Sequence, residues 1–236
     1  MAVRKILMLK KEGKIWTFLL EDDVIAEIHC ALPDSEQHRQ PVLGDIYIGK
    51  VKNIAANIGA AFIEILPGKE CYYDLSQASQ AIFTHKIGKK PLCIGDELVV
   101  QISREAVKTK APTVSSNINF TGRYAVLTTG NTRIGTSGKL SRSIREDYKE
   151  RLSYLKNEDY GLIIRTNAKD VAFETVLEEI QKLESAYVKL KETAPFRTCF
   201  SCLQEALPSY ITDLKNVYTD GLSAIITDDP DRKSVV

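Results

Sequence analysis

The stretch Gly44-Asp-Ile-Tyr-Ile-Gly-Lys-Val51 decides the fold class of the middle of the chain. Ile46 and Ile48 stand at alternate positions, which is the period of a β-strand. Turn signals at 57–59 and 67–68 separate this stretch from further short apolar runs. We expect strands in those runs, at 60–66, 71–74 and 96–102. Short strands at this spacing predict a small barrel or a sandwich.

Toward the N-terminus, residues 4–31 contain three short apolar runs with turn signals at 12–14 and 21–23. We expect a meander of three strands. The polar segment 33–41 is bounded by prolines and is typical of a linker.

Toward the C-terminus, 118–128 carries strand signals, and 131–141 is rich in Gly, Ser and Thr and is expected to be a loop. A helix is predicted over 142–155, and a buried strand over 161–166. A long amphipathic helix is expected from Asp170, capped by Asn167 or Asp170, because apolar residues recur at helical spacing: Val176, Ile180, Leu183, Tyr187 and Leu190. The segment 214–231 is expected to form a strand, a turn and a second strand.

Composition narrows the class of protein. The chain has 236 residues, of which 44% are hydrophobic and 27% charged, so a packed core is feasible and wholesale disorder is not expected. A net charge of +1 argues against a uniformly basic nucleic-acid binder, although local basic patches remain open. No signal peptide and no membrane span is expected. We therefore expect a cytoplasmic protein whose five cysteines are reduced.

The segment that opens at 44–51 and closes at 94–102 resembles an S-one-type OB-fold, an RNA-binding barrel. Such barrels bind single strands by stacking bases on exposed aromatic rings beside a cationic groove. Phe62 and Tyr72 are the candidate stacking residues, and the residues leave open that Phe62 belongs to the barrel core instead. Three lysines are candidates for phosphate contacts: Lys50, Lys52 and Lys110.

A phosphate site is the hypothesis for the stretch Gly161-Leu-Ile-Ile-Arg-Thr166. A strand delivers Arg165 and Thr166 side by side shortly before a helix begins. Arginine offers a planar fork of donors that matches phosphate oxygens, and a helix N-terminus adds a favourable dipole. The local charge agrees, since residues 104–151 hold ten basic and four acidic side chains. A solvated, charge-rich helix accounts for part of that excess.

In the order of its segments, the whole chain resembles the ribonuclease E/G family. The matching pieces span most of the sequence: 44–50, 59–65, 95–102, 110–115, 122–127, 135–137 and 161–166. The resemblance implies an α+β fold in which an incomplete RNase H-like subdomain contains an inserted S-one-type OB-fold β-barrel, followed by an α/β 5′-sensor subdomain. The implied boundaries are 1–38 and 206–236 for the RNase H-like part, 39–115 for the barrel and 116–205 for the sensor.

The resemblance also implies a partner, single-stranded RNA with a 5′-monophosphate. It assigns the 5′-phosphate to five residues: Arg165, Thr166, Gly122, Val126 and Lys139. It assigns RNA stacking to Phe62 and Tyr72 and a backbone contact to Lys110. Tyr72 stands where family members often carry Phe, which keeps the stacking face. Gly138-Lys139 stands where a more basic pair occurs.

Catalysis is expected to lie outside this chain. The family cleaves RNA with Mg²⁺ held by two aspartates of a DNase I-like subdomain, and no carboxylate pair here stands in matching context. We therefore expect no catalytic residue, no metal ligand, and no cleavage by this chain alone. A stand-alone OB-fold RNA-binding or regulatory module is the alternative, and a structural barrel without a nucleic-acid partner is a third. A homo-oligomer is left open.

Two further groups of residues have metal-like spacing. Asp228-Asp229-Pro-Asp231 follows a strand and is explained more simply as a turn than as a Mg²⁺ site. Cys199 and Cys202 supply only two of the four ligands that zinc needs. Incidental thiols are favoured for this pair, and it stays unassigned.

Overall fold

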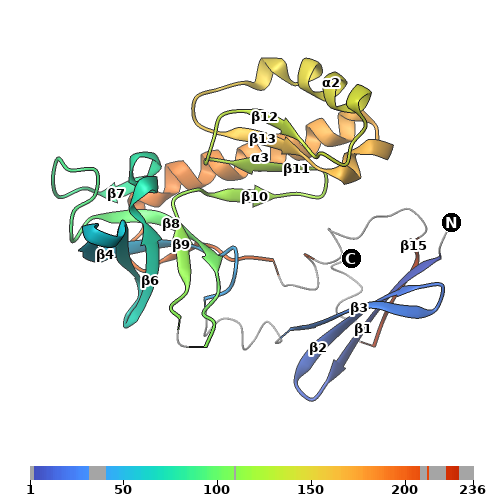
Figure 1. The fold of residues 1–236 in the computed structure, drawn as a ribbon, viewed down its shortest axis with the longest axis horizontal. Coiled ribbons are helices and arrows are strands. Elements are labelled where there is room, and N and C mark those ends of the chain that lie inside the picture. The colour runs from blue at the N-terminus through green and yellow to red at the C-terminus, as the bar shows by residue number, and fades with distance from the viewer. Residues whose placement is uncertain (1–2, 32–40, 109, 208–211, 213–221, 229–236) are drawn as a thin grey trace. The chain divides into compact units, whose positions relative to one another are not determined.

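A computed structural model describes residues 3–31, 41–108, 110–207, 212 and 222–228 of the chain. The polypeptide divides into two compact units (Figure 1). One comprises residues 42–206. The other comprises residues 1–41 together with 207–236.

The unit that contains the N-terminus is built on a four-stranded sheet in the order β15-β1-β2-β3. Strands β1 (Arg4–Lys11), β2 (Lys14–Glu21) and β3 (Val24–Ala31) form the predicted antiparallel meander. Strand β15 (Leu222–Thr227) pairs with β1 in parallel, although more than 200 residues separate them along the chain. Three side chains form the small core: Ile6, Met8 and Ile15.

Five strands of the larger unit close into a barrel. They are β4 (Ile46–Ala55), β5 (Ala60–Leu66), β6 (Lys69–Asp74), β8 (Glu97–Arg104) and β9 (Thr113–Ser115). Neighbours around the ring are β4-β5-β6-β9-β8, and the additional pairing of β4 with β8 closes it. The β6–β9 pair is parallel and the others are antiparallel. A closed five-stranded barrel is consistent with an OB-fold and resolves the choice between barrel and sandwich.

Every second side chain along the strands points inward, and these side chains fill the interior of the barrel. Inward side chains are fully buried and include Val51, Ile63, Ile65 and Tyr73, whose hydroxyl hydrogen-bonds to Ser116 at 2.7 Å. A Cβ at Gly49 of β4 would collide with the Ile63 side chain of β5, so only glycine fits at this position.

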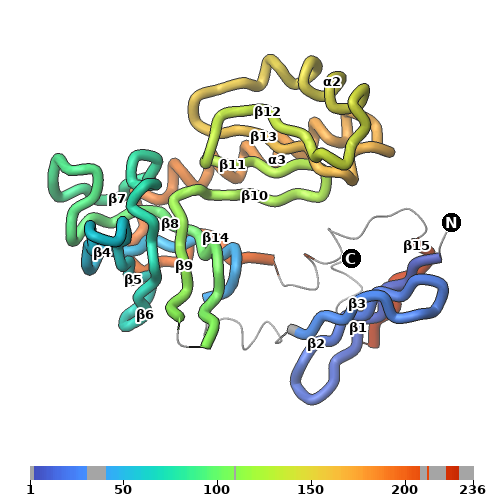
Figure 2. Tube along the Cα trace, in the orientation of Figure 1, coloured from blue at the N-terminus to red at the C-terminus, as the bar shows by residue number. Residues whose placement is uncertain are grey.

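Smaller elements decorate the barrel. Strand β7 (Phe83–His85) extends the sheet beyond β8, and β14 (Cys202–Gln204) lies beside β4 (Figure 2). Two 3₁₀ turns complete it: η1 (Ala56–Ile58) and η2 (Leu75–Gln80).

A second sheet in the same unit has the order β10-β11-β13-β12. Its strands are β10 (Asn119–Thr121), β11 (Ala125–Thr128), β12 (Ile134–Thr136) and β13 (Gly161–Ile164). The remaining elements around this sheet are α2 (Arg142–Arg151), η3 (Ser153–Leu155), η4 (Thr166–Asp170), α3 (Phe173–Thr193) and η5 (Ala194–Phe196).

Helix α3 covers one face of this sheet, packing on β10 and β11 (Figure 1). Its buried side chains are those expected from the spacing, Val176, Ile180, Tyr187 and Leu190. Barrel residues Ile46 and Val99 belong to the same core as α3 and the sheet, so barrel and sheet share apolar packing.

Two local predictions were wrong. Neither Asn167 nor Asp170 caps α3, because both lie in η4, and the helix begins after Ala172 without a side-chain cap. The segment expected to be a loop contains β12, which pairs in parallel with β13. Gly and Thr in a three-residue strand carry no apolar alternation, so its pairing depends on the neighbouring strand.

Candidate functional site

Phe62 and Tyr72 lie directly opposite each other on adjacent strands β5 and β6. Their neighbours Ala61, Ile63 and Tyr73 point inward and are fully buried. Phe62 and Tyr72 therefore lie on the outer face of the barrel, where both are half-buried. The two side chains are cross-strand neighbours on the same face of the paired strands, and we call Phe62 and Tyr72 the aromatic pair.

The loop that carries Lys110 borders the aromatic pair. The Tyr72 N–H donates to the Pro112 carbonyl at 2.9 Å, and Tyr72 pairs with Thr113 of β9. Lys110 precedes this segment and is exposed in a turn, where its N–H donates to the Val107 carbonyl at 3.0 Å. The connection between β8 and β9 thus carries the exposed Lys110 and meets Tyr72 at Pro112 and Thr113.

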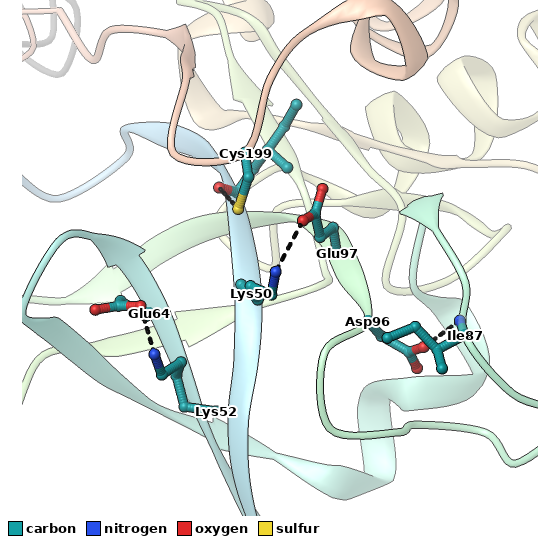
Figure 3. A network of polar contacts seen from close by, with 8 residues as sticks. Lys50, Lys52, Glu64, Ile87, Asp96, Glu97 and Cys199 are labelled. Carbon is teal, nitrogen blue, oxygen red and sulfur yellow. Dashed lines mark hydrogen bonds and ion pairs between the residues drawn. The ribbon is translucent and has the colours of Figure 1, made fainter.

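The other two candidate lysines are paired with carboxylates (Figure 3). Lys52 Nζ lies 3.1 Å from Glu64 Oε2, and Lys50 Nζ lies 3.5 Å from Glu97 Oε1. Hydrogen bonds from the Gly68 N–H and from Lys52 lower the pKa of Glu64, so that this carboxylate is ionised at neutral pH. The cationic groove expected here is therefore partly neutralised by the protein itself.

Arg165 follows directly after β13 and is tied to the turn between β10 and β11. Its backbone N–H donates to the Tyr124 carbonyl at 2.7 Å, and its Nη1 donates to the Gly122 carbonyl at 2.6 Å. Burial lowers the pKa of Arg165, while the charge of Glu179 opposes that shift. An arginine stays protonated in spite of such a shift, so the site holds a fixed positive charge.

Thr166 meets the loop that follows β12. Its Oγ1 lies 2.9 Å from Ser137 Oγ, and the Ser137 N–H donates to the Ile164 carbonyl at 2.7 Å. Lys139 is exposed in the same loop, and its N–H donates to Ser137 Oγ at 3.3 Å. Because β12 and β13 are parallel, their carboxyl ends share one edge of the sheet. We call this edge, with Ser137, Lys139, Arg165 and Thr166, the polar edge.

The two remaining predicted residues lie next to the polar edge. Val126 is half-buried on β11 opposite Ile163, which is 38% exposed; the flanking Ala125 and Leu127 are buried in the shared core. Gly122 is buried in the turn that holds Arg165.

The structure thus assembles two groups of predicted residues, one on the barrel and one at the second sheet. It adds two residues that the sequence did not point to, Ser137 and Glu179. Ser137 closes the Gly135-Thr-Ser stretch, which was noted only as a matching piece. Glu179 had no local signal, since it is one of many acidic residues on a helix.

No role is assigned to Cys199 and Cys202, whose thiols are both free. The Cys199 thiol (Figure 3) faces the Ile48 carbonyl at 4.0 Å. All five cysteines are free thiols. Burial raises the pKa of Cys199 and of Cys202 to about 11, which keeps both thiols protonated and poorly reactive at neutral pH.

Asp228 acts in the fold of the smaller unit. Its Oδ2 accepts from the Lys10 N–H at 2.8 Å and its own N–H donates to the Met8 carbonyl at 3.3 Å, so it ties the end of β15 to β1. Asp229 and Asp231 lie outside the described residues. Within the described part of the chain, no group of three or more His, Cys, Asp or Glu side chains is arranged to hold a metal ion.

In the part of the chain that the structure describes, none of the helices has the length and apolar character to cross a bilayer.

Comparison with known proteins gives a consistent result. The model of the ribonuclease E/G family matches residues 119–236. Ribonuclease E of Synechocystis sp. is 30% identical over 80% of this chain and 28% of its own length. Ribonuclease G of Salmonella typhimurium is 26% identical over 73% of this chain and 37% of its own length. The chain thus spans less than two fifths of the length of each of these relatives. With half of its length matched by the family model, the chain belongs to the ribonuclease E/G family.

Proposed function

We propose that this chain is the RNA-binding and 5′-monophosphate-sensing portion of a single-strand-specific endoribonuclease that acts in RNA processing or decay. Family membership supports a ribonuclease-related role, and the relatives are named ribonuclease E and ribonuclease G. We propose binding rather than cleavage for this chain, as the resemblance to the family implies. Magnesium-dependent cleavage is proposed only for the intact enzyme.

The single observation that carries the proposal is the arrangement at the polar edge. Arg165 brings a planar fork of N–H donors, and its bond to the Gly122 carbonyl sets the direction of that fork. Thr166 and Ser137 add hydroxyl groups 2.9 Å apart, and exposed Lys139 adds a second positive charge. A terminal phosphate, with up to two negative charges and three acceptor oxygens, matches this combination.

The aromatic pair supplies the second part of the proposed function. Stacking on Phe62 and Tyr72 requires bases that are free of a duplex, which favours single-stranded RNA. Stacking tolerates any base, so the barrel binds without reading a sequence. An RNA backbone contact is assigned to Lys110, and this is supported by the hydrogen bond that joins the stretch just after it, at Pro112, to Tyr72.

The proposed subdomains follow the family pattern. A sheet with three antiparallel strands and β15 parallel to β1 supports an RNase H-like assignment for the smaller unit. We assign the barrel to 39–115 and the sensor to 116–205.

The test is equilibrium binding of a short single-stranded RNA at fixed salt, with a 5′-monophosphate or a 5′-hydroxyl end. The native chain is expected to prefer the monophosphate, and Arg165→Ala is expected to remove that preference while weaker binding through the barrel remains. Arg142→Ala is the matched control, because Arg142 lies on α2 with an 85% exposed side chain.

Equal binding of the two ends by the native chain would overturn the sensor assignment. Complete absence of RNA binding would overturn the whole proposal in favour of a structural barrel.

A further inference from the structure

Glu179 reaches from α3 into the turn between β10 and β11. Its carboxylate accepts three successive backbone N–H groups, from Arg123 at 2.8 Å, Tyr124 at 2.7 Å and Ala125 at 2.9 Å. The neighbouring Gly122 N–H donates to the Ala125 carbonyl at 2.9 Å and closes the turn. Hydrogen bonds to an ionised acceptor are the strong ones, so one side chain holds the whole turn in place.

Gly122 is explained by the same contact. A Cβ at this position would lie 2.5 Å from Glu179 Cδ and would also collide with the carboxylate oxygens. Gly122 does not have a positive φ, so backbone conformation is not the reason for a glycine here. The absence of a side chain is what allows the Glu179 carboxylate to reach the three N–H groups.

The turn held by Glu179 is also the turn that holds Arg165. On its other side the turn presents the Gly122 carbonyl to Arg165 Nη1 at 2.6 Å and the Tyr124 carbonyl to the Arg165 N–H at 2.7 Å. The chain of contacts therefore runs from the Glu179 carboxylate through the backbone of 122–125 to the guanidinium. The charge of Glu179 also favours the protonated guanidinium in its partly buried position.

We propose that Glu179 is a positioning residue for the phosphate site, which sets the direction of the Arg165 guanidinium through the turn at 122–125. The inference rests on the proposed function, because it concerns how the same site recognises a phosphate. Glu179 acts through Arg165, since its carboxylate is occupied by backbone N–H groups and would repel a phosphate directly.

The first test is Glu179→Gln, which keeps the shape of the side chain but replaces a charged acceptor by an amide whose NH₂ faces a backbone N–H. The preference for 5′-monophosphate RNA over 5′-hydroxyl RNA is expected to fall about tenfold, the size that follows the loss of a charged hydrogen-bond partner. Glu178→Gln is the matched control, because this residue is next in sequence, exposed, and carries the same charge. It is expected to keep the native preference.

A second pair of variants separates positioning from general support of the fold. Arg165→Lys keeps the positive charge but lacks the planar fork of donors. Phosphate binding by the lysine therefore depends less on the direction in which the side chain is held. In this background Glu179→Gln is expected to change the preference less than twofold. A purely structural role would lower the affinity by the same factor in both backgrounds. If Glu179→Gln fails to fold, Gly122→Ala disturbs the same contact from the side of the turn.

The outcomes distinguish the two claims. If the native chain shows no preference between the two RNA ends, the proposed function fails. If the native chain prefers the monophosphate and Glu179→Gln keeps that preference, or loses affinity equally in both arginine and lysine backgrounds, the positioning role is wrong while the proposed function stands.

Discussion

The two groups of candidate residues are assembled in different ways. The aromatic pair comes from strands joined by a short turn, and it lies outside the barrel because its neighbours in sequence fill the inside. The polar edge and its support draw on segments far apart in the chain, the turn at 122–125, the loop after β12, the end of β13, and α3. Local alternation therefore suffices to build the aromatic pair, whereas the polar edge depends on tertiary packing.

The largest expected effect tests the stacking half of this comparison. Replacing both Phe62 and Tyr72 by Ala removes two stacking faces, each worth about 1–3 kcal/mol per base, so RNA affinity is expected to fall at least about 30-fold. The loss should be equal for 5′-monophosphate and 5′-hydroxyl RNA, measured by fluorescence anisotropy. Tyr72→Phe, which keeps the ring, is the control and should bind as the native chain does. An unequal loss for the two ends would mean that the two regions are not separate.

The next prediction concerns the effect of low pH on the stability of the barrel and on the charge of Arg165. Asp96 is fully buried at the barrel and accepts hydrogen bonds from Lys86, the Ile87 N–H and the Cys93 N–H. Burial raises its pKa, but these hydrogen bonds outweigh burial, and the net pKa is lowered. Since the folded pKa lies below the unfolded one, the stabilisation is fully present above about pH 4 and is lost as pH falls through the folded pKa.

Asp96→Asn is therefore expected to reduce the free energy of unfolding by about 2 kcal/mol at pH 7, because it leaves Lys86 without its carboxylate. The difference between native and variant should shrink below about pH 4, measured by urea denaturation across pH. A difference that stays constant on acidification would contradict the assignment. The charge of Arg165, in contrast, is unaffected over this range.

The smallest expected effect concerns Lys52, whose ammonium group is paired with Glu64 on the strand that carries Phe62. Glu64→Gln removes the partner of Lys52, which then becomes available to an RNA phosphate. The plot of log affinity against log salt should steepen by about 0.7, the value for one added phosphate contact with a single strand. Glu70→Gln is the matched control, since Glu70 is exposed and lies opposite Glu64 on β6. An unchanged slope for Glu64→Gln would mean that Lys52 does not reach the RNA.

Much of the barrel could be predicted from the sequence, because its strands carry apolar alternation and its turns carry Asn, Gly and Pro. The ring closure between β4 and β8 could not, since it joins segments about 50 residues apart. The same holds for β15, whose partner β1 lies at the other end of the sequence. The apolar pattern of a strand predicts which of its faces is buried, but it does not predict which other strand pairs with it.

The candidate residues divide in the same manner. The position of Phe62 outside the barrel follows from Ala61 and Ile63 filling the inside, although an isolated aromatic residue in a strand is more often core. That Arg165 and Thr166 directly follow a buried strand was predictable from the apolar run before them. Glu179 was not, because its role depends on α3 packing against the turn at 122–125, and no spacing in the sequence encodes that contact. The cap of α3 was missed because η4 intervenes between strand and helix.

The separation of end recognition from stacking is tested most directly by combining Arg165→Ala with the double substitution of Phe62 and Tyr72 by Ala. Binding of 5′-monophosphate and 5′-hydroxyl RNA would be measured for the native chain, each variant and the combination. Two independent sites predict that the free-energy losses add, with the end preference lost only when Arg165 is replaced. An end preference that survives Arg165→Ala, or one that disappears when only the aromatic pair is removed, would contradict the assignment.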